Sequence, residues 1–221
     1  MKNLFFAFFT AFFAAFIAAG PASANVDPSS VQIKILAMAL SPNVDCSNPL
    51  LISSFPSGKT VEFMSSSPPN LGGGFIPTGA YPCVVLQMSD VITFTPATSE
   101  GSCTAGVPVT RDVCRPPRFY TAFTVSGTTI TYGANTGCNG AQNAPVEDDV
   151  PLFLSTASTT SGNGAGSVAF QQPTTSATGV NLNGAFVVGG SSAGTFVVDF
   201  HGRVDGSGAT CDLKAPTFSF R

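Results

Sequence analysis

Residues 119–132, with the sequence FYTAFTVSGTTITY, contain two runs of β-favouring residues joined by Ser126 and Gly127. Aromatic and β-branched residues, which suit a pleated strand, dominate both the run at 119–125 and the run at 128–132. A two-residue connection that contains Gly is typical of a β-hairpin, because Gly adopts the positive φ that tight hairpin turns need. This stretch therefore predicts antiparallel strand pairing in the middle of the chain.

Short runs of the same kind lie on both sides of this hairpin. Residues 31–35 alternate apolar and polar and lead into an apolar run at 36–40, which predicts a strand that becomes buried on both faces. In the last third of the chain, residues 180–188 and 196–200 predict a hairpin around a glycine loop. Further strands are predicted at 60–64, 83–88, 91–94, 152–154, 211–213 and 217–220. Roughly ten short strands separated by Gly and Pro turns predict an all-β fold, an antiparallel β-sandwich.

The composition limits the size and class of the protein. The 221 residues are 43% hydrophobic and 10% charged, with a formal net charge of -3. This acidic balance excludes an extended basic surface for nucleic acid, and the recurring apolar runs argue against disorder. The chain predicts one exported domain at 25–221. The loop-rich segment 96–118 is a candidate subdomain boundary.

The first 24 residues predict a signal peptide. Lys2 precedes a stretch at 4–19 that is apolar except for Thr10, and Ala22-Ser23-Ala24 provides the small residues that a signal peptidase requires. The alternative is an N-terminal membrane anchor, although a stretch of 16 residues is slightly shorter than a membrane span needs. No transmembrane segment is predicted in the mature chain. We therefore expect a secreted, periplasmic or cell-surface protein.

An even number of cysteines in an exported chain predicts three disulfides. Six cysteines allow 15 pairings, and the sequence alone does not choose among them. Our preferred set joins Cys103 with Cys114 as a local loop staple, Cys46 with Cys83, and Cys138 with Cys211. The alternative is a metal site, but no two cysteines have the C-x-x-C spacing and the chain has one histidine.

Two stretches resemble known β-sandwich families. Residues 75–81, FIPTGAY, which precede the strand at 83–88, resemble the turn before a strand in transthyretin-like and carboxypeptidase-regulatory-like modules. Residues 194–200 together with 213–216 are similar to the ending of an uncharacterised family of bacterial exported domains. The resemblance implies a β-sandwich at the cell envelope and brings no catalytic residues with it.

Two charged clusters are candidate binding sites. Arg111, Arg115 and Arg118 surround Cys114, and guanidinium groups on such a loop suit an anionic glycan or a partner's carboxylate. The acidic run Glu147, Asp148 and Asp149 offers oxygen ligands to calcium, although it lacks the spacing of an EF-hand loop. Structural or solvent-facing roles are the alternative for both clusters, and no other cofactor is predicted.

The sequence predicts a non-enzymatic cell-envelope protein with a binding, adhesion or scaffolding role, whose partner is a protein or a glycan. One alternative is a small outer-membrane β-barrel, suggested by the alternating strands. A second alternative is a secreted hydrolase that uses Asp199 and His201, which period-two alternation places on one face of a strand.

Overall fold

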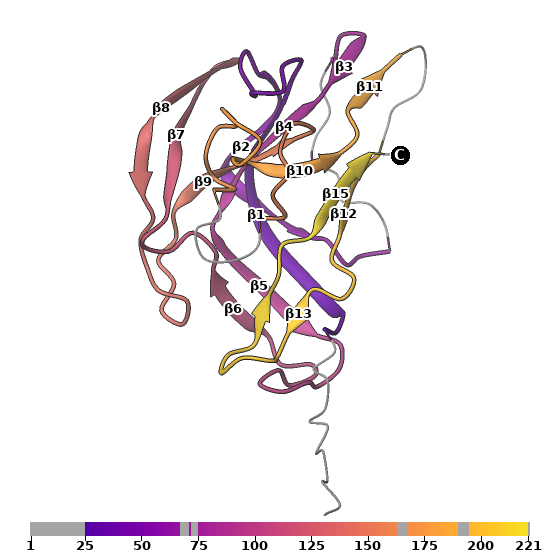
Figure 1. The fold of residues 1–221 in the computed structure, drawn as a ribbon, viewed down its shortest axis with the longest axis vertical. Coiled ribbons are helices and arrows are strands. Elements are labelled where there is room, and N and C mark those ends of the chain that lie inside the picture. Colours follow the sequence, from indigo (N-terminus) through magenta and orange to yellow (C-terminus); the bar gives the residue numbers. More distant parts are fainter. Residues whose placement is uncertain (1–24, 67–70, 72–74, 163–167, 190–194, 221) are drawn as a thin grey trace, which may run out of the picture.

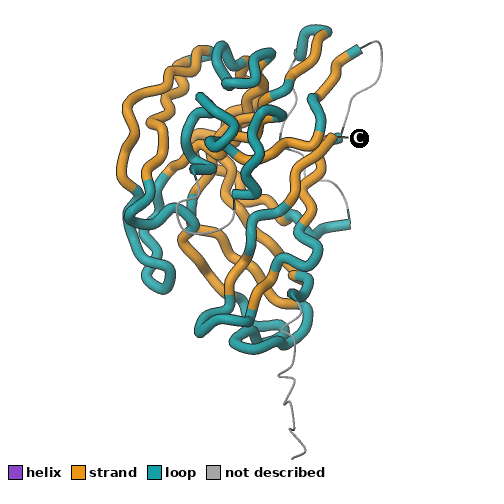
Figure 2. Tube along the Cα trace, viewed as in Figure 1, coloured by secondary structure: helices purple, strands orange, loops and turns teal. Residues whose placement is uncertain are grey.

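The computed structural model describes residues 25–66, 71, 75–162, 168–189 and 195–220. The signal peptide predicted at 1–24 lies outside the described residues. Within the described part of the chain, Figure 2 shows strands and loops and no helix. The prediction of an all-β fold is therefore confirmed.

Fifteen strands follow one another in the described residues, as labelled in part in Figure 1. The first eight are β1 (Pro28–Ser41), β2 (Leu50–Glu62), β3 (Gly79–Tyr81), β4 (Cys83–Ser89), β5 (Val91–Pro96), β6 (Val109–Asp112), β7 (Phe119–Ser126) and β8 (Thr129–Gly137). The other seven are β9 (Asp149–Ser155), β10 (Val180–Asn183), β11 (Phe186–Val188), β12 (Phe196–Asp199), β13 (Val204–Asp205), β14 (Asp212–Leu213) and β15 (Thr217–Phe220). The segment 96–118, the candidate subdomain boundary, contributes β6, which joins the main sheet by pairing with β5.

Strand β1 organises the main sheet. β2 pairs with it antiparallel, from Gln32 with Glu62 to Leu40 with Leu50. β4 pairs with residues 35–41 of β1, and β5 pairs with residues 28–32. A single residue, Asp90, separates β4 from β5. The two therefore act as one long strand that follows β1 and bends at Asp90.

The sheet divides at this bend, because β9 pairs with β4 whereas β6 pairs with β5. The Asp90 main chain joins the two branches: its N–H donates to Asp148 O over 3.0 Å, and its carbonyl accepts from Val113 N over 3.0 Å. We call this junction the fork. It comprises Asp90, the end of β6 at Asp112 and the start of β9.

The main sheet curls into a half-barrel and does not clearly form a two-sheet sandwich (Figure 1). Beyond β9 it continues through β10 and β15 to β12. The pairs β9–β10 and β10–β15 are parallel, so the prediction of a purely antiparallel sheet is wrong. Strand twist, together with the bend at Asp90, gives a sheet this long its curvature.

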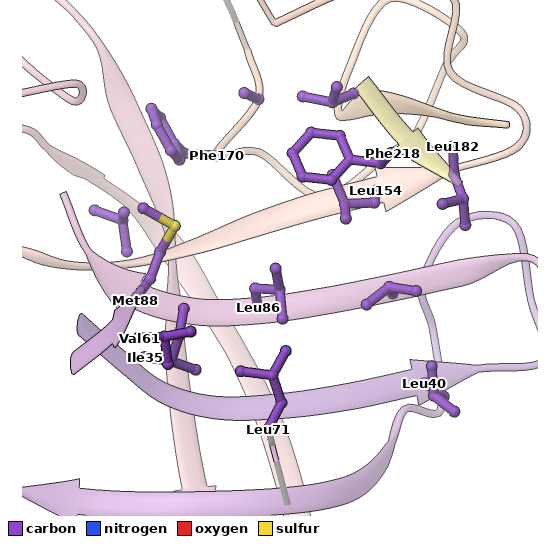
Figure 3. Close-up of a cluster of buried hydrophobic side chains, with 14 of the residues drawn as sticks. Ile35, Leu40, Val61, Leu71, Leu86, Met88, Leu154, Phe170, Leu182 and Phe218 are labelled. Carbon is purple, nitrogen blue, oxygen red and sulfur yellow. The ribbon is translucent and has the colours of Figure 1, made fainter. Parts of the chain in front are cut away.

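The main sheet is buried on both faces where β4 crosses it. On one face Val84, Leu86 and Met88 belong to the largest hydrophobic cluster, and Figure 3 shows Leu86 and Met88 on the same side of β4 as Phe170. On the other face Cys83 and Val85 belong to a second cluster. This alternation follows from the two-residue period of a strand.

The second face is covered by a ribbon formed by β7 and β8, which confirms the predicted hairpin. Its turn is Gly127-Thr128, one residue later than predicted, and Gly127 has a φ of 60°. Tyr132 anchors the ribbon, since its hydroxyl donates to Cys46 O over 3.1 Å and its ring centroid lies 5.6 Å from that of Phe153.

The predicted hairpin between residues 180–188 and 196–200 is wrong. β11 pairs with β3, through Phe186 with Tyr81, whereas β12 pairs with β15, through Phe196 with Phe220. Each strand finds its partner in a segment distant in sequence, which local alternation cannot reveal. The predicted glycine loop falls partly on residues 190–194, outside the described residues.

Three disulfides bond all six cysteines, so the predicted number is confirmed. Cys46 bonds Cys83 as predicted. Cys103 bonds Cys211, and Cys114 bonds Cys138, so the predicted pairs 103–114 and 138–211 are wrong. Main-chain hydrogen bonds explain why the observed cysteine pairs differ from the predicted ones. Ser102 N donates to Gly206 O and Cys138 N donates to Arg118 O, each over 3.0 Å, which brings the observed partners together.

Candidate ligand-binding site

A cavity of about 590 Å³ lies between the main sheet and the segments that face it. Residues of β1, β4, β5 and β9 line it from the sheet. The loop after β6 and the C-terminal residues 198–218 supply much of the opposite lining. A volume of this size lies in the range typical of small-molecule sites.

Most of the cavity lining is apolar. Leu86 and Met88 contribute from β4, while Phe170 and Phe218 contribute from segments after β9. Figure 3 shows these four side chains in one cluster above β4. Transfer of apolar ligand surface from water into such a site is favourable by about 25 cal/mol per Å². The arrangement therefore favours binding of a molecule with a substantial apolar part.

Strand β6 and the loop after it bring all three predicted arginines into the cavity lining. The disulfide Cys114–Cys138 holds this loop, and the peptide between Pro116 and Pro117 is cis. Arg111 is tied to the C-terminal segment, because its Nε donates to Cys211 O over 3.0 Å and to Asp212 Oδ1 over 3.3 Å. That these arginines bind an anionic glycan or a partner's carboxylate stays a prediction.

Arg115 and Arg118 fold back onto their own loop. Arg115 Nη1 donates to the carbonyl of Asp112 over 2.7 Å, and Arg118 Nη1 donates to the carbonyl of Val113 over 2.6 Å. Burial lowers the pKa of Arg118, and the positive charge of Arg115 lowers it further. The two guanidinium groups are therefore close enough to repel each other within a partly desolvated loop.

Two fully buried carboxyl groups lie at the fork, and sequence analysis missed both as site residues. Asp112 lines the cavity, whereas Asp90 fills the bend between β4 and β5. Asp90 Oδ1 accepts from Asp148 N over 2.7 Å, and Asp112 Oδ2 accepts from Val146 N over 3.5 Å. The other oxygen of each, Asp90 Oδ2 and Asp112 Oδ1, is buried without a hydrogen-bond partner.

Burial raises the pKa of both carboxyls at the fork. The pKa of Asp90 rises to about 8, mainly through desolvation and with a contribution from the negative charge of Asp112. The pKa of Asp112 also rises, again mainly through desolvation. One sequence signal could have identified Asp90 as a buried carboxyl group, because it interrupts an apolar strand pattern at 83–94.

The predicted calcium ligands point to separate partners. Glu147 Oε1 lies 2.9 Å from Lys34 Nζ in an ion pair that lowers the pKa of Glu147. Asp148 accepts from Asn139 N over 2.7 Å, and Asp149 lies in β9 opposite Ser89. Among the described residues, no group of three or more His, Cys, Asp or Glu is placed to hold a metal ion.

The predicted Asp199–His201 pair does not form through the two side chains. Asp199 Oδ1 accepts a hydrogen bond from the main-chain N–H of His201 over 2.9 Å. The imidazole Nδ1 of His201 instead lies 3.0 Å from Asp27 Oδ1, and 82% of the His201 side chain is exposed. The prediction failed because β12 ends at Asp199, so period-two alternation does not continue to His201.

The described residues include no helix with the length and apolarity needed to cross a membrane. No family model, curated protein or solved structure matches this chain. The resemblance to transthyretin-like and carboxypeptidase-regulatory-like modules therefore stays a prediction. In the stretch that carries it, residues 79–81 form β3, and the Tyr81 hydroxyl donates to Pro77 O over 2.8 Å.

Proposed function

We propose that this protein is an exported, non-enzymatic binding protein of the cell envelope whose cavity holds a small, largely apolar molecule. The observation that carries the proposal is the cavity of about 590 Å³, lined mainly by apolar side chains. A cavity that combines apolar walls with a few polar groups is the usual form of a small-molecule site. Three disulfides support the export part of the proposal, because structural disulfides persist in oxidising compartments.

The arrangement of strands and disulfides supports a rigid binding site. The walls belong to the main sheet, to a loop held by Cys114–Cys138 and to a C-terminal segment held by Cys103–Cys211. A site on elements that are fixed in place loses little conformational entropy when a ligand enters. This property suits a carrier or receptor.

Titration with Nile red, an uncharged apolar dye, tests the proposal. We expect saturable binding by the purified protein with an increase in dye emission. Ala169→Phe should abolish the binding, because Ala169 is buried in the cavity lining and a phenyl ring fills part of the space. Val198→Trp, at a less buried position of the same lining, provides a second variant if Ala169→Phe does not fold.

The matched control is Val187→Phe, which enlarges an apolar side chain that is 62% exposed on β11 and lies outside the cavity lining. It should bind the dye as the unmodified protein does. Absence of saturable binding, or unchanged binding in folded Ala169→Phe and Val198→Trp, would contradict the proposed function. Export is tested separately by mass spectrometry of the native protein, which should begin at Asn25.

A further inference from the structure

Four phenylalanine side chains line the cavity, and each comes from a different segment of the chain. Phe63 directly follows β2, and Phe170 lies between β9 and β10. Phe200 directly follows β12, and Phe218 lies in β15. The strands β1 and β4 supply aliphatic lining residues, such as Leu86. The aromatic part of the lining therefore exists only in the folded chain, where these segments meet.

Phe63 and Phe200 form a fixed pair of rings. Their ring centroids lie 6.0 Å apart, and the ring planes are inclined at 64°. In such an arrangement the positive edge of one ring meets the negative face of the other, which is a preferred geometry of aromatic pairs. The main chain holds Phe63 in place, because its N–H donates to Val31 O over 2.9 Å. Phe63 is partly exposed and lines the cavity, so a ligand can reach this pair.

Phe170 and Phe218 form a second aromatic part of the lining. Figure 3 shows both rings on the same side of β4 as Met88. The Phe170 carbonyl accepts a hydrogen bond from Thr121 N over 2.9 Å, which fixes the main chain at this position. The ring of Phe196 stacks on that of Phe218, with centroids 6.1 Å apart and planes inclined at 14°. Both residues are therefore held by contacts outside the cavity lining.

This lining favours an aromatic ligand over an aliphatic ligand of the same size. Burial of apolar surface stabilises both kinds of ligand to a similar degree. An aromatic ligand also gains contacts between its rings and the phenylalanine rings, which stabilise beyond the burial of area. The Met88 thioether in the lining adds to this preference, because such sulfur atoms make favourable contacts with ring edges. A flexible alkyl chain, by contrast, loses rotational freedom when it is bound.

We infer that the ligand of this cavity carries an aromatic ring system, which packs among Phe63, Phe170 and Phe218. The inference rests on the proposed function, because it names the class of molecule that the same cavity binds. A cavity of about 150 Å³ is enough for one benzene ring. The cavity described above, of about 590 Å³, therefore has room for two or more fused rings.

Calorimetric titration with β-naphthol, with its saturated form decahydro-β-naphthol and with decanol tests the inference. The three ligands have the same number of carbon atoms and one hydroxyl group each, and they differ in aromaticity and flexibility. We expect β-naphthol to bind about fivefold or more tightly than decahydro-β-naphthol, as contacts to two or more rings predict. Decanol should bind no more tightly than the saturated ring compound. Equal affinity for β-naphthol and decahydro-β-naphthol would overturn the inference.

Variants show whether the phenylalanine rings cause the preference. Phe63→Leu and Phe170→Leu keep an apolar side chain and remove the ring, so each should lower the ratio of the affinities for β-naphthol and decahydro-β-naphthol. The ratio is the informative quantity, because a general loosening of the site weakens the binding of both ligands. If Phe170→Leu does not fold, Phe63→Leu, at a less buried position, decides the question. A ratio that is unchanged in every folded variant would overturn the assignment.

The matched control is Phe123→Leu, which makes the same change at a partly buried position of β7 outside the cavity lining. It should keep the full preference for β-naphthol. The tests also separate the two proposals. If β-naphthol does not bind, or binds no more tightly than the saturated ligands, the aromatic assignment is overturned. The proposed function then stands if Nile red or a saturated ligand binds, and it fails as well if none of them binds.

Discussion

Arg111 donates a hydrogen bond from Nε to Asp212 Oδ1 over 3.3 Å, although the two residues are 101 positions apart in the sequence. Arg111 lies in β6 and Asp212 lies in β14, directly after Cys211. Arg111 Nε also donates to Cys211 O over 3.0 Å. The contact therefore joins the loop-bearing edge of the main sheet to the C-terminal segment that completes the cavity, and it distinguishes Arg111 from Arg115 and Arg118.

Replacement of Arg111 should reduce stability. Arg111→Gln removes the hydrogen bonds to Cys211 and Asp212, while Asp212 keeps Gln142 and Thr210 as partners. We expect the free energy of unfolding to fall by about 1–3 kcal/mol. Each kcal/mol lowers the melting temperature of a chain of this length by roughly 2–4 °C. Thermal denaturation followed by circular dichroism measures this. Arg203→Gln, with no such contact, should change stability by less than about 0.5 kcal/mol; equal losses in both variants would contradict the structural role.

The buried carboxyl of Asp90 should make stability depend on pH. Because the pKa of Asp90 is about 8 in the folded protein and about 3.9 in an unfolded chain, the folded state retains its proton over this interval. Stability from this group is therefore highest at low pH and decreases as the pH rises from about 4 to 8. Asp90→Asn keeps an acceptor for Asp148 N and cannot ionise.

The measurement is the difference in melting temperature between Asp90→Asn and the unmodified protein at several pH values. The advantage of the variant in melting temperature should be small at pH 5 and should grow as the pH rises to 8. The difference removes the contributions of other titrating groups, such as Asp112 and Asp149. A difference that stays constant from pH 5 to 8 would show that Asp90 does not have the raised pKa.

Replacement of Gly140 should disturb the fork. A Cβ at this position would overlap Asp112 Oδ2 and the main-chain nitrogen of Val146, and Gly140 has a φ of +77°. Gly140→Ala should therefore lower the free energy of unfolding by more than the roughly 1 kcal/mol that a positive φ alone costs an L-residue. Gly127→Ala is the matched control, since Gly127 has a φ of +60° and nothing lies within 4 Å of its added Cβ. Equal losses in chemical denaturation would argue against a tight contact at Asp112.

The disulfide between Cys103 and Cys211 should be the most stabilising of the three. It spans 108 residues, whereas the other two span 37 and 24. A chain-entropy model gives about 4.7 kcal/mol for a loop of about 100 residues and about 3 kcal/mol for a short one. Denaturation of Cys103→Ala/Cys211→Ala and of Cys114→Ala/Cys138→Ala compares them. Peptide mapping without reduction checks the pairing itself, and a 103–114 or 138–211 peptide would refute it.

Local patterns in the sequence were enough to locate many of the strands. The alternation at 31–40 and the run at 83–88 correspond to β1 and β4, and the stretch at 119–132 corresponds to the β7–β8 ribbon. The sequence missed the first part of β2, where Ser53, Pro56 and Lys59 obscure the alternation. Within the described sheet β2 pairs only with β1, and such an edge strand tolerates polar residues and Pro.

The candidate site was only partly accessible to sequence reasoning. The three arginines were predicted as an anion-binding cluster because they surround Cys114, and the structure places all of them in the cavity lining. Their different roles could not be predicted, because Arg111 is distinguished by Asp212, a residue far away in the sequence. The apolar walls were equally hidden, since Leu86 and Phe218 have the pattern of ordinary core residues.

The sequence by itself determined that the described chain is built of strands and that its six cysteines form three disulfides. Strand propensity and two-residue alternation are properties of neighbouring residues, so a single sequence displays them directly. Only the tertiary structure decided that Cys103 bonds Cys211, that β11 pairs with β3, and that the main sheet divides at Asp90. These features depend on which distant segments meet, and that choice follows from packing of the whole chain around the curled sheet.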